Sequence, residues 1–564
     1  MGSDTLIQVH GPVPTHQTLK SKLVGDATAL GHEVFLAEGV PFSKYQSRVY
    51  ANLLAKLIVE KTKHSTANTQ FNIYEFGAGS GLLSKGILDQ LRSRYPRVYS
   101  QTQLYISDIC AKSLDDMQES GMFATHEGHV KFYVRDFLEA EFFKEAPPFF
   151  IYSTYLYDAL PSHRIVLDGG KAYEILTETY LPKEADFIDV FSEMPRRLST
   201  DEIMPMLTDS NFERRWQLRY QIGSQLLENY IHRPISESNF SPDLQTAISE
   251  YAAQNPHLKA TPFSIAPAFF ELMKRLAKVP NLTFFSAEVS FQGTDQLCKL
   301  PLGRTTMTYG LISYHALFWP LAKSIFTKLG VSSHITPRED GSSAEFLLET
   351  GSPNIQAQFF KLFSSGFSST GEFTQSLKEE MPISVLKTSL LKFHQTVKGA
   401  QKLEFSHINN MANMLVKVGE WDLAVAYAKL LRRLVPSLAA SSYIVFGLVA
   451  RETKANRREE FWLTKGVHQF KLNRMLRVQL VNFYLRVQRD EKAIAHSQAL
   501  LKLAERPEIL TLMLQIALLY IRIKDRVHAG QWLSGILALK RGLKHPLDSD
   551  KDVFAKAEQL AQKL

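Results

Sequence analysis

Cysteine is almost absent from this chain of 564 residues, which has only Cys110 and Cys298. Two cysteines so far apart exclude a disulfide framework and a cysteine-rich metal site, and they suit a reducing compartment. No apolar run approaches the ~18 residues that a membrane span needs. The first residues, MGSDTLIQVHGPVP, lack the basic-then-apolar order of a secretion signal. We therefore expect a cytoplasmic protein with no membrane contact.

The net charge of the chain is also small for its length. Lys and Arg number 65 against 57 Asp and Glu, which gives a net charge of +8. No dense stripe of Lys and Arg interleaved with aromatic residues is present, so we expect no nucleic-acid partner. Basic residues become denser around 431–490, where solvated helix faces explain them. His, Cys, Asp and Glu show no metal-ligand spacing and no G-x-S-x-G elbow occurs, which excludes the corresponding metal and serine-hydrolase sites.

The most informative stretch is 71–81, FNIYEFGAGSG. An apolar run leads into Gly77, Gly79 and Gly81, and the following residues have the apolar spacing of an amphipathic helix. Strand, glycine turn and helix bring the backbone close to a ligand at a helix N-terminus. The turn lacks both the Lys-Ser/Thr of a P-loop and the third glycine of GxGxxG. It predicts a nucleoside site, although a tight turn without a ligand could have the same sequence.

Acids follow the next two expected strands. LYISDI (104–109) contains Asp108, and HVKFYVRDF (129–137) contains Asp136 next to Phe137. Ligands bind at the carboxyl ends of strands in open α/β sheets. Asp108 therefore suits the hydroxyls of a ribose, and Asp136 with Phe137 suits the edge of an adenine. A fourth strand in 147–161 brings its carboxyl end to the same crevice, and the DGG turn after it predicts a hairpin.

The heptapeptide E-F-G-A-G-S-G resembles motif I of class I S-adenosylmethionine (SAM)-dependent methyltransferases. The resemblance implies a Rossmann-like α/β fold with SAM as its cofactor. It also implies a cofactor site in which Glu75 orients the methionine end through its amine. The other implied contacts are the backbone of Gly77, Ala78, Gly79 and Gly81, and the side chains of Asp108, Asp136 and Phe137.

The segment T-Y-L-Y-D-A-L-P (154–161), followed by a hairpin, resembles the MidA-like methyltransferases, which include a mitochondrial complex I assembly factor. That family typically has N-E-F-F-D-A-L-P, so Thr154 and Tyr155 replace its Asn-Glu pair. The family member with a known target methylates a protein arginine, and the missing Glu puts arginine specificity in doubt. For the acceptor side we expect Asp158 as the catalytic carboxylate, with Tyr155 lining the pocket. A carboxylate at such a turn can equally cap backbone N–H groups.

These patterns predict four parts. They are an N-terminal lead-in (1–40), a methyltransferase domain (41–350) with a helical insertion at about 195–260, a linker (351–378) and a helical-repeat domain (379–564). The helix expected over 41–63 is either a lid over SAM or a plain packing helix. His315 is expected on an apolar helix face, where a core role is commoner than a substrate contact.

The C-terminal part consists of recurring helix-sized segments. Its turns at Gly419, Asn456, Asp490 and Asp525 recur at close to the ~34-residue period of tetratricopeptide (TPR) repeats. Single consensus positions match poorly, so the likeness is to the TPR architecture. Stacked helix pairs commonly hold a peptide or protein, although a homodimer contact or a scaffold is the alternative.

Together these features predict a SAM-dependent methyltransferase whose protein or peptide acceptor docks on the repeats. The rival hypothesis is a weakly catalytic or non-catalytic assembly protein that keeps the SAM fold, which the Thr154-Tyr155 replacement favours. A small-molecule methyltransferase that self-associates through its repeats is a third.

Overall fold

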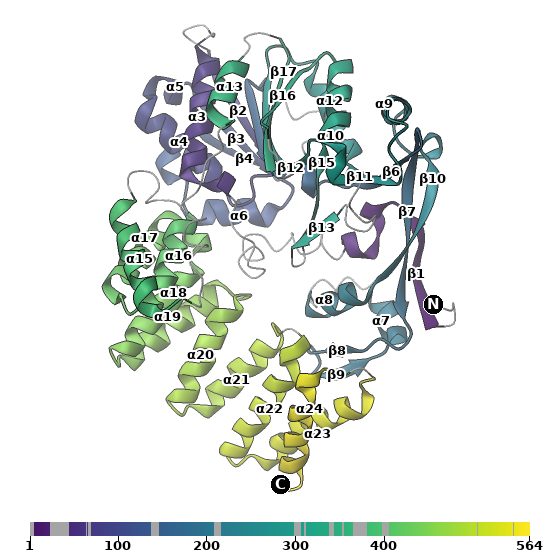
Figure 1. Ribbon diagram of the computed structural model, residues 1–564. Coiled ribbons are helices and arrows are strands. Elements are labelled where there is room, and N and C mark those ends of the chain that lie inside the picture. The colour runs from purple at the N-terminus through teal and green to yellow at the C-terminus, as the bar shows by residue number, and fades with distance from the viewer. Residues whose placement is uncertain are drawn as a thin grey trace.

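The computed structural model describes residues 5–22, 44–63, 65, 69–136, 146–207, 216–297, 306–309, 312–337, 343–351, 355–364, 381–397, 405–504, 506–544 and 546–564. An α/β region comes first and an all-helical arm follows it (Figure 1). The predicted fold class, a Rossmann-like α/β domain followed by a helical domain, is confirmed.

The α/β region has these elements in chain order: β1 (Leu6–Val13), η2 (Thr15–Gln17), η3 (Lys44–Gln46), α3 (Arg48–Thr62), β2 (Phe71–Phe76), α4 (Leu82–Arg94), α5 (Pro96–Ser100), β3 (Thr102–Asp108), α6 (Ala111–Glu119), η4 (Ala124–His126), β4 (Val130–Val134), β5 (Phe150–Thr154), η5 (Tyr157–Ala159), β6 (His163–Asp168), β7 (Lys171–Pro182), β8 (Phe187–Asp189), β9 (Arg196–Leu198), α7 (Thr200–Met206), α8 (Trp216–Gln225), β10 (Leu227–Pro234), η7 (Ile235–Glu237), α9 (Pro242–Gln254), β11 (Thr261–Ile265), α10 (Pro267–Leu276), β12 (Thr283–Phe291), α11 (Thr294–Leu297), β13 (Thr306–Tyr309), β14 (Ile312–His315), β15 (Leu317–Phe318), α12 (Trp319–Lys328), β16 (Ser332–Ile335), β17 (Ser343–Glu349) and α13 (Gln356–Phe363).

A large mixed sheet forms the centre of this region. Its parallel part has the order β4-β3-β2-β5-β12, and β17 pairs with β12 in the antiparallel direction. The strand β2 comes first in sequence but lies in the middle, so the order reverses between β2 and β5. In open α/β sheets the ligand binds at such a switch point, outside the carboxyl ends of the strands. The predicted glycine turn and the Thr154–Asp158 segment follow these two strands.

The sheet continues beyond β12 through β15, β11, β6 and β7. The predicted hairpin is confirmed, because β6 and β7 pair around Gly169 and Gly170, whose φ values are +56° and +83°. The N-terminal lead-in contains more order than its weak pattern indicated. Its β1 pairs with β7 at the sheet edge, where the partner strand supplies the hydrogen bonds that a short strand cannot supply itself.

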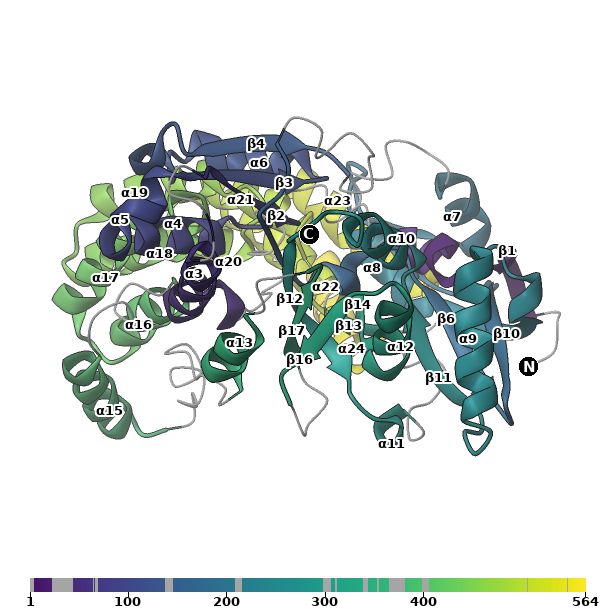
Figure 2. The ribbon, with the colours of Figure 1, turned by 90° about the horizontal axis from the view of Figure 1, so that it is seen from above.

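Helices cover both faces of the parallel strands. Seen from above, α3, α4 and α13 lie on one side, and α10 and α12 lie on the other (Figure 2). The helix predicted before the glycine turn is α3, which begins at the N-cap Ser47. It packs closely on α4, since a Cβ at Gly86 would lie 2.7 Å from Ala51 Cβ. Its buried side chains make α3 a packing helix.

Two predicted segments contain secondary structure that the sequence did not indicate. The insertion at about 195–260 is not wholly helical, because β10 pairs with β7 along its whole length. The helix before it, α8, ends at Gln225. From Leu227 onward, pairing with β7 makes the chain a strand. The segment predicted as a linker at 351–378 contains α13, whose Phe359 and Phe363 are buried against the core. The Ser and Gly residues of the segment 351–378 made this short apolar helix hard to predict from the sequence.

The arm consists of α15 (Ile383–Thr396), α16 (Phe405–Lys417), α17 (Trp421–Leu434), η10 (Pro436–Leu438), α18 (Ala440–Glu452), α19 (Asn456–Gln469), α20 (Arg474–Arg486), α21 (Asp490–Leu501), α22 (Arg506–Arg522), α23 (Arg526–Gly542) and α24 (Asp548–Ala561). None of the helices in the described ranges combines the length and the apolar character that crossing a bilayer requires.

The arm repeats one turn four times. Gly419, Lys454, Gln488 and Lys524 all have a positive φ, from +52° to +77°. In each case the next residue's N–H donates to the carbonyl five residues before it, as Ala455 does to Ala450 at 2.8 Å. This left-handed C-terminal turn ends a helix and starts its antiparallel partner. The recurrence shows repeated helix pairs.

Candidate functional site

The glycine turn is open where the sequence predicts a ligand. Gly77, Gly79 and Gly81 have φ values of +64°, +52° and +70°, a region that side-chain-bearing residues adopt at a cost. A Cβ at Gly79 would meet no atom of the described residues within 4 Å, and one at Gly77 would meet, of these residues, only Leu156 Cδ1 at 3.5 Å. At Gly81 it would lie 2.7 Å from the sulfur of Met117, so this glycine is required for packing.

Asp108 lies against this turn, as predicted. Its Oδ2 accepts a hydrogen bond from the Gly79 N–H at 3.0 Å, and its Oδ1 accepts one from the Cys110 N–H at 2.8 Å. The carboxylate is therefore fixed by two backbone groups at the carboxyl end of β3. Beside it, Ile109 is 77% exposed, and Val134 at the end of β4 is 55% exposed. Two exposed apolar side chains next to an acid and a bare turn suit the flat base and the sugar of a nucleoside.

The other predicted adenine contacts are described only in part. Asp136 lies two residues beyond β4 and is half-buried. Phe137 lies outside the described residues. Their roles in the site stay predictions.

Glu75 is buried beneath the glycine turn. Its carboxyl accepts from Ser84 Oγ, and Ser84 Oγ lies 2.5 Å from the Tyr152 hydroxyl. Burial raises the pKa of Glu75 to about 8, against the opposing effect of the Ser84 hydrogen bond and with a further rise from Asp108. Glu75 therefore holds a proton at neutral pH in this structure. A nearby ammonium group would favour its ionised form, and its predicted contact with the methionine amine stays a prediction.

A second turn faces the first across the switch point. After β5 the chain passes through Tyr155, whose φ of +55° is unusual for a side chain with a Cβ, and enters η5. The Tyr155 N–H donates to the Ala287 carbonyl at 2.9 Å, and its hydroxyl lies 3.3 Å from Ser343 Oγ. Strained backbone of this kind persists where surrounding contacts fix it.

The segment η3 connects the two turns. Ser80 Oγ in the glycine turn donates to Gln46 Oε1 at 3.3 Å, and the Tyr45 ring packs on the Tyr155 ring with centroids 5.5 Å apart. The described part of 41–63 that makes these two contacts is thus η3, ahead of α3. The role of Tyr155 as a pocket-lining residue stays a prediction.

Asp158 is buried in η5. The neighbouring Glu288 of β12 is fully buried and accepts from the Leu156 N–H at 3.0 Å. Burial raises the pKa of Asp158 well above its usual range, and the Glu288 carboxyl raises it further. Sequence reasoning missed Glu288. The available signal was a single acid inside the apolar strand NLTFFSAEVSF.

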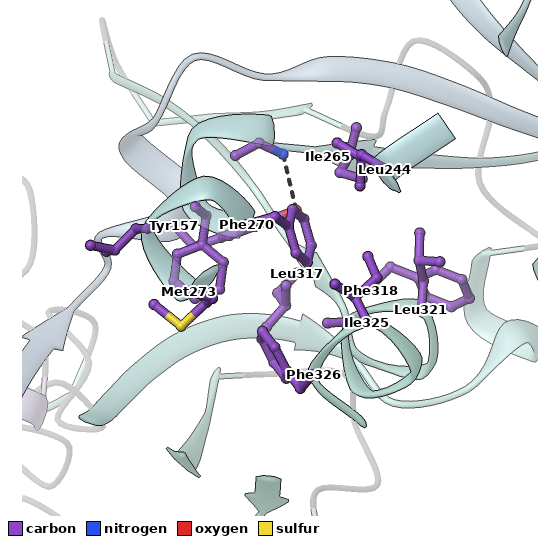
Figure 3. Close-up of a cluster of buried hydrophobic side chains, with 14 of the residues drawn as sticks. Tyr157, Leu244, Ile265, Phe270, Met273, Leu317, Phe318, Leu321, Ile325 and Phe326 are labelled. Atoms are coloured by element: carbon purple, nitrogen blue, oxygen red, sulfur yellow. Dashed lines mark hydrogen bonds between the residues drawn. The ribbon is translucent and has the colours of Figure 1, made fainter. Parts of the chain in front are cut away.

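His315 is in a different element from the one predicted. It ends strand β14 and is buried against Tyr157, with ring centroids 5.2 Å apart. Burial lowers its pKa to about 3, so it is neutral, and within the described ranges its Nε2 has no hydrogen-bond partner. The helix begins four residues later, at Trp319. Tyr157 itself lies in the apolar cluster behind the sheet, where its hydroxyl accepts from the Ala266 N–H (Figure 3).

The site thus combines an open, side-chain-free turn, an acid fixed at its edge and exposed apolar residues beside that acid. These features fit SAM. Gly77, Gly79, Asp108 and Ile109 would hold the nucleoside, and a bound SAM would supply an electrophilic methyl group. In the described part of the chain, His, Cys, Asp and Glu side chains form no group that could hold a metal ion.

Residues 53–254 match the family model described as "Putative S-adenosyl-L-methionine-dependent methyltransferase". The match includes the glycine turn, Asp108 and Asp158. This region is therefore similar to that methyltransferase family. Its cofactor is SAM, and the sequence resemblance to the MidA-like methyltransferases is confirmed.

Two solved structures show a weak likeness to this chain. A Burkholderia thailandensis protein bound to S-adenosyl-homocysteine has 13% identity and a TM-score of 0.36, with 58% of this chain and 74% of that one covered. An uncharacterized protein from the same organism has 11% identity and a TM-score of 0.37, with 60% and 87% covered. At these TM-scores the likeness carries no argument about the site. The comparison with curated proteins finds no match.

Proposed function

We propose that this methyltransferase modifies a protein or peptide acceptor that docks on its helical arm. The contact between the arm and the cofactor turn is the observation that carries this proposal. Leu82, the first residue of α4 after Gly81, packs against the apolar core formed by α15 to α18. An acceptor bound to the arm would therefore lie beside the methyl donor.

The far end of the arm also returns to the α/β region, beside β8 and β9 (Figure 1). Ile188 and Val190 are buried in the same apolar cluster as α22 to α24. The Lys544 N–H donates to Asp186 Oδ2 at 2.5 Å, and Lys544 Nζ pairs with Glu184 at 2.6 Å. The arm therefore contacts the α/β region near both of its ends. This arrangement favours an extended chain or a protruding side chain as the acceptor.

The charge of the arm indicates the kind of segment that docks. Residues 383–564 contain 30 Lys and Arg against 15 Asp and Glu, whereas residues 1–382 contain 35 against 42. On α19, the exposed side chains of Arg457, Arg458 and Lys465 surround Phe461, which is 55% exposed. Lys465 Nζ lies 5.8 Å from the Phe461 ring centroid. We call these four residues the α19 patch. It suits an acidic segment with an apolar side chain.

Incubation of the full chain with tritiated SAM and cell lysate tests the proposal. We expect label in protein, and we expect reversal of Arg457, Arg458 and Lys465 to Glu to lower the initial rate severalfold. The matched control reverses Lys551, Lys556 and Lys563, which are exposed on or just after α24, and should leave the rate unchanged. Label confined to small molecules would contradict the proposed acceptor.

One observation favours the rival function, an assembly protein with little or no catalysis. The position that carries Glu in the family is Tyr155 here, and its hydroxyl lies within hydrogen-bonding distance of Ser343. SAM binding without any label in protein or small molecules would support this rival.

A further inference from the structure

Two carboxyl groups are buried side by side at the acceptor end of the site. Asp158 follows β5 and is 7% exposed, and Glu288 lies on the adjacent parallel strand β12 and is 0% exposed. Among the interactions of the described residues, neither forms an ion pair with Lys or Arg. Adjacent buried carboxyl groups without a cation cannot both ionise at low cost, so they share a proton at neutral pH.

Glu288 also fixes the turn that carries Asp158. Its Oε1 accepts from the Leu156 N–H at 3.0 Å and from Ser286 Oγ at 2.6 Å. Ser286 Oγ lies 2.7 Å from Ser153 Oγ on β5, which ties the two strands together. The backbone N–H groups of Tyr157 and Asp158 also approach this carboxyl group. Its second oxygen, Oε2, is buried and has no well-aligned hydrogen-bond partner among the described residues. An unpaired buried carboxyl oxygen is costly and indicates a place for a polar hydrogen donor.

Among the residues that the structure describes, the other titratable groups around the pair supply no positive charge. His315 of β14 is buried and neutral, with its own Nε2 unpaired. The Tyr157 hydroxyl donates to the Ser264 carbonyl at 3.3 Å. Glu345 of β17, next to β12, accepts from Thr336 Oγ1 at 2.7 Å, and Glu75 of β2 accepts from Ser84. The surroundings therefore favour one shared proton and one negative charge.

We propose that Asp158 and Glu288 act as a pair in which Asp158 takes the proton of an N–H or O–H acceptor and Glu288 positions and tunes it. Glu288 thus supplies, from β12, a carboxyl group that the family pattern has directly after β5. This inference rests on the methyl transfer proposed above. In the step, the acceptor atom forms a bond to the methyl carbon while the sulfur–carbon bond breaks. The acceptor proton passes to the ionised oxygen of the pair, and the sulfur leaves as a neutral thioether.

The test compares Glu288→Gln with Glu288→Ala in the full chain. The Gln amide oxygen can still accept from the Leu156 N–H, whereas Ala removes the contact. Without the neighbouring carboxyl, Asp158 ionises at lower pH. We therefore expect the rising limb of the pH–rate profile for tritium transfer to lysate protein to move down by about one pH unit in Glu288→Gln. If Glu288 had only a structural role, Glu288→Gln would lower the rate without moving the rising limb of the pH–rate profile. That result would overturn the inference.

A second readout does not depend on activity. The buried pair holds a proton that the unfolded chain releases at lower pH, so the unfolding constant rises with pH by up to tenfold per unit. Glu288→Gln should reduce this slope in urea titrations between about pH 5 and about pH 8. If the pH dependence of unfolding were the same in Glu288→Gln as in wild type, the proposed pairing of Asp158 with Glu288 would be overturned. The buried control Glu345→Gln should leave the limb of the rate profile in place.

Failure of this inference differs from failure of the proposed function. If wild type labels no lysate protein but Glu288→Gln still reduces the slope, the shared proton stands and the protein acceptor is wrong. If wild type labels protein and neither readout changes in Glu288→Gln, the protein acceptor stands and the pair is wrong.

Discussion

The backbone N–H of Gly79 donates to Oδ2 of Asp108 at 3.0 Å, so the acid at the end of β3 is fixed to the turn after β2. This contact joins two strand ends that the sequence separates by about thirty residues. It aligns the carboxylate with the open backbone at Gly77 and Gly79.

Asp108→Ala should weaken SAM binding at least tenfold, which corresponds to about 1.4 kcal/mol. The change removes the carboxylate predicted to accept from the ribose, and it leaves the N–H groups of Gly79 and Cys110 without this partner. Isothermal titration calorimetry measures the effect. Asp115→Ala, on the exposed face of α6, is the control and should bind as wild type does. If Asp108→Ala bound SAM as tightly as wild type does, Asp108 would not be part of the cofactor site.

Glu75→Gln should flatten the pH dependence of stability. Burial raises the folded-state pKa to about 8, above its ordinary value of 4.5, so between these values the folded chain holds a proton that the unfolded chain has lost. The free energy of unfolding then falls as pH rises, by about 1.4 kcal/mol per unit for one such group. Gln has no proton to lose, so this contribution disappears.

Urea unfolding at about pH 5 and about pH 8 measures the difference. The decrease in the free energy of unfolding from the lower to the higher pH should be smaller in Glu75→Gln than in wild type. The exposed Glu127→Gln is the control and should lose as much as wild type. A loss in Glu75→Gln equal to that of wild type would show that Glu75 is ionised in the folded chain.

Lys454→Gly should stabilise the arm. Lys454 occupies the left-handed position of its turn with φ +52°, where a Cβ costs about 1 kcal/mol relative to glycine. The equivalent turn already has Gly419, so Gly419→Ala should destabilise by a similar amount. Thr453, one residue before Lys454, has φ −82°, and Thr453→Gly should destabilise. Thermal unfolding that ranks these three variants differently would contradict the shared turn geometry.

Asp186→Ala should release the far end of the arm. Asp186 accepts from Arg197 Nε at 2.6 Å and from the Lys544 N–H at 2.5 Å, and it is largely buried. Loss of both contacts should cost about 2 kcal/mol locally. Amide hydrogen exchange should then become faster in β8, β9 and α23. The exposed Glu193→Ala is the control, and equal protection in both variants would mean that apolar packing alone fixes this contact.

Local patterns were enough to predict much of the methyltransferase core. The apolar run before Gly77 and the glycine spacing predict β2, the turn and α4, because strand and helix periodicities are local properties. Asp108 could be assigned to the same edge because parallel strands share one direction. The DGG turn predicted the β6–β7 hairpin for the same local reason.

Long-range pairing decided what the sequence did not predict. β1 and β10 are strands because β7 lies between them, and neither segment shows clean alternation. Glu288 reaches Asp158 only because β12 pairs with β5, more than a hundred residues earlier. His315 was placed on a helix because apolar residues on both sides hid the strand β14. Contacts of this kind have no local signal in a single chain.

Calorimetric titration of SAM into the full chain and into Gly79→Arg tests the central claim most directly. A Cβ at Gly79 meets no atom of the described residues within 4 Å, so an Arg side chain there would project into the open turn. We expect micromolar binding to wild type and no measurable binding to Gly79→Arg, with both proteins giving the same circular dichroism spectrum. Absence of binding to wild type, or equal binding to both, would contradict a cofactor site at this turn.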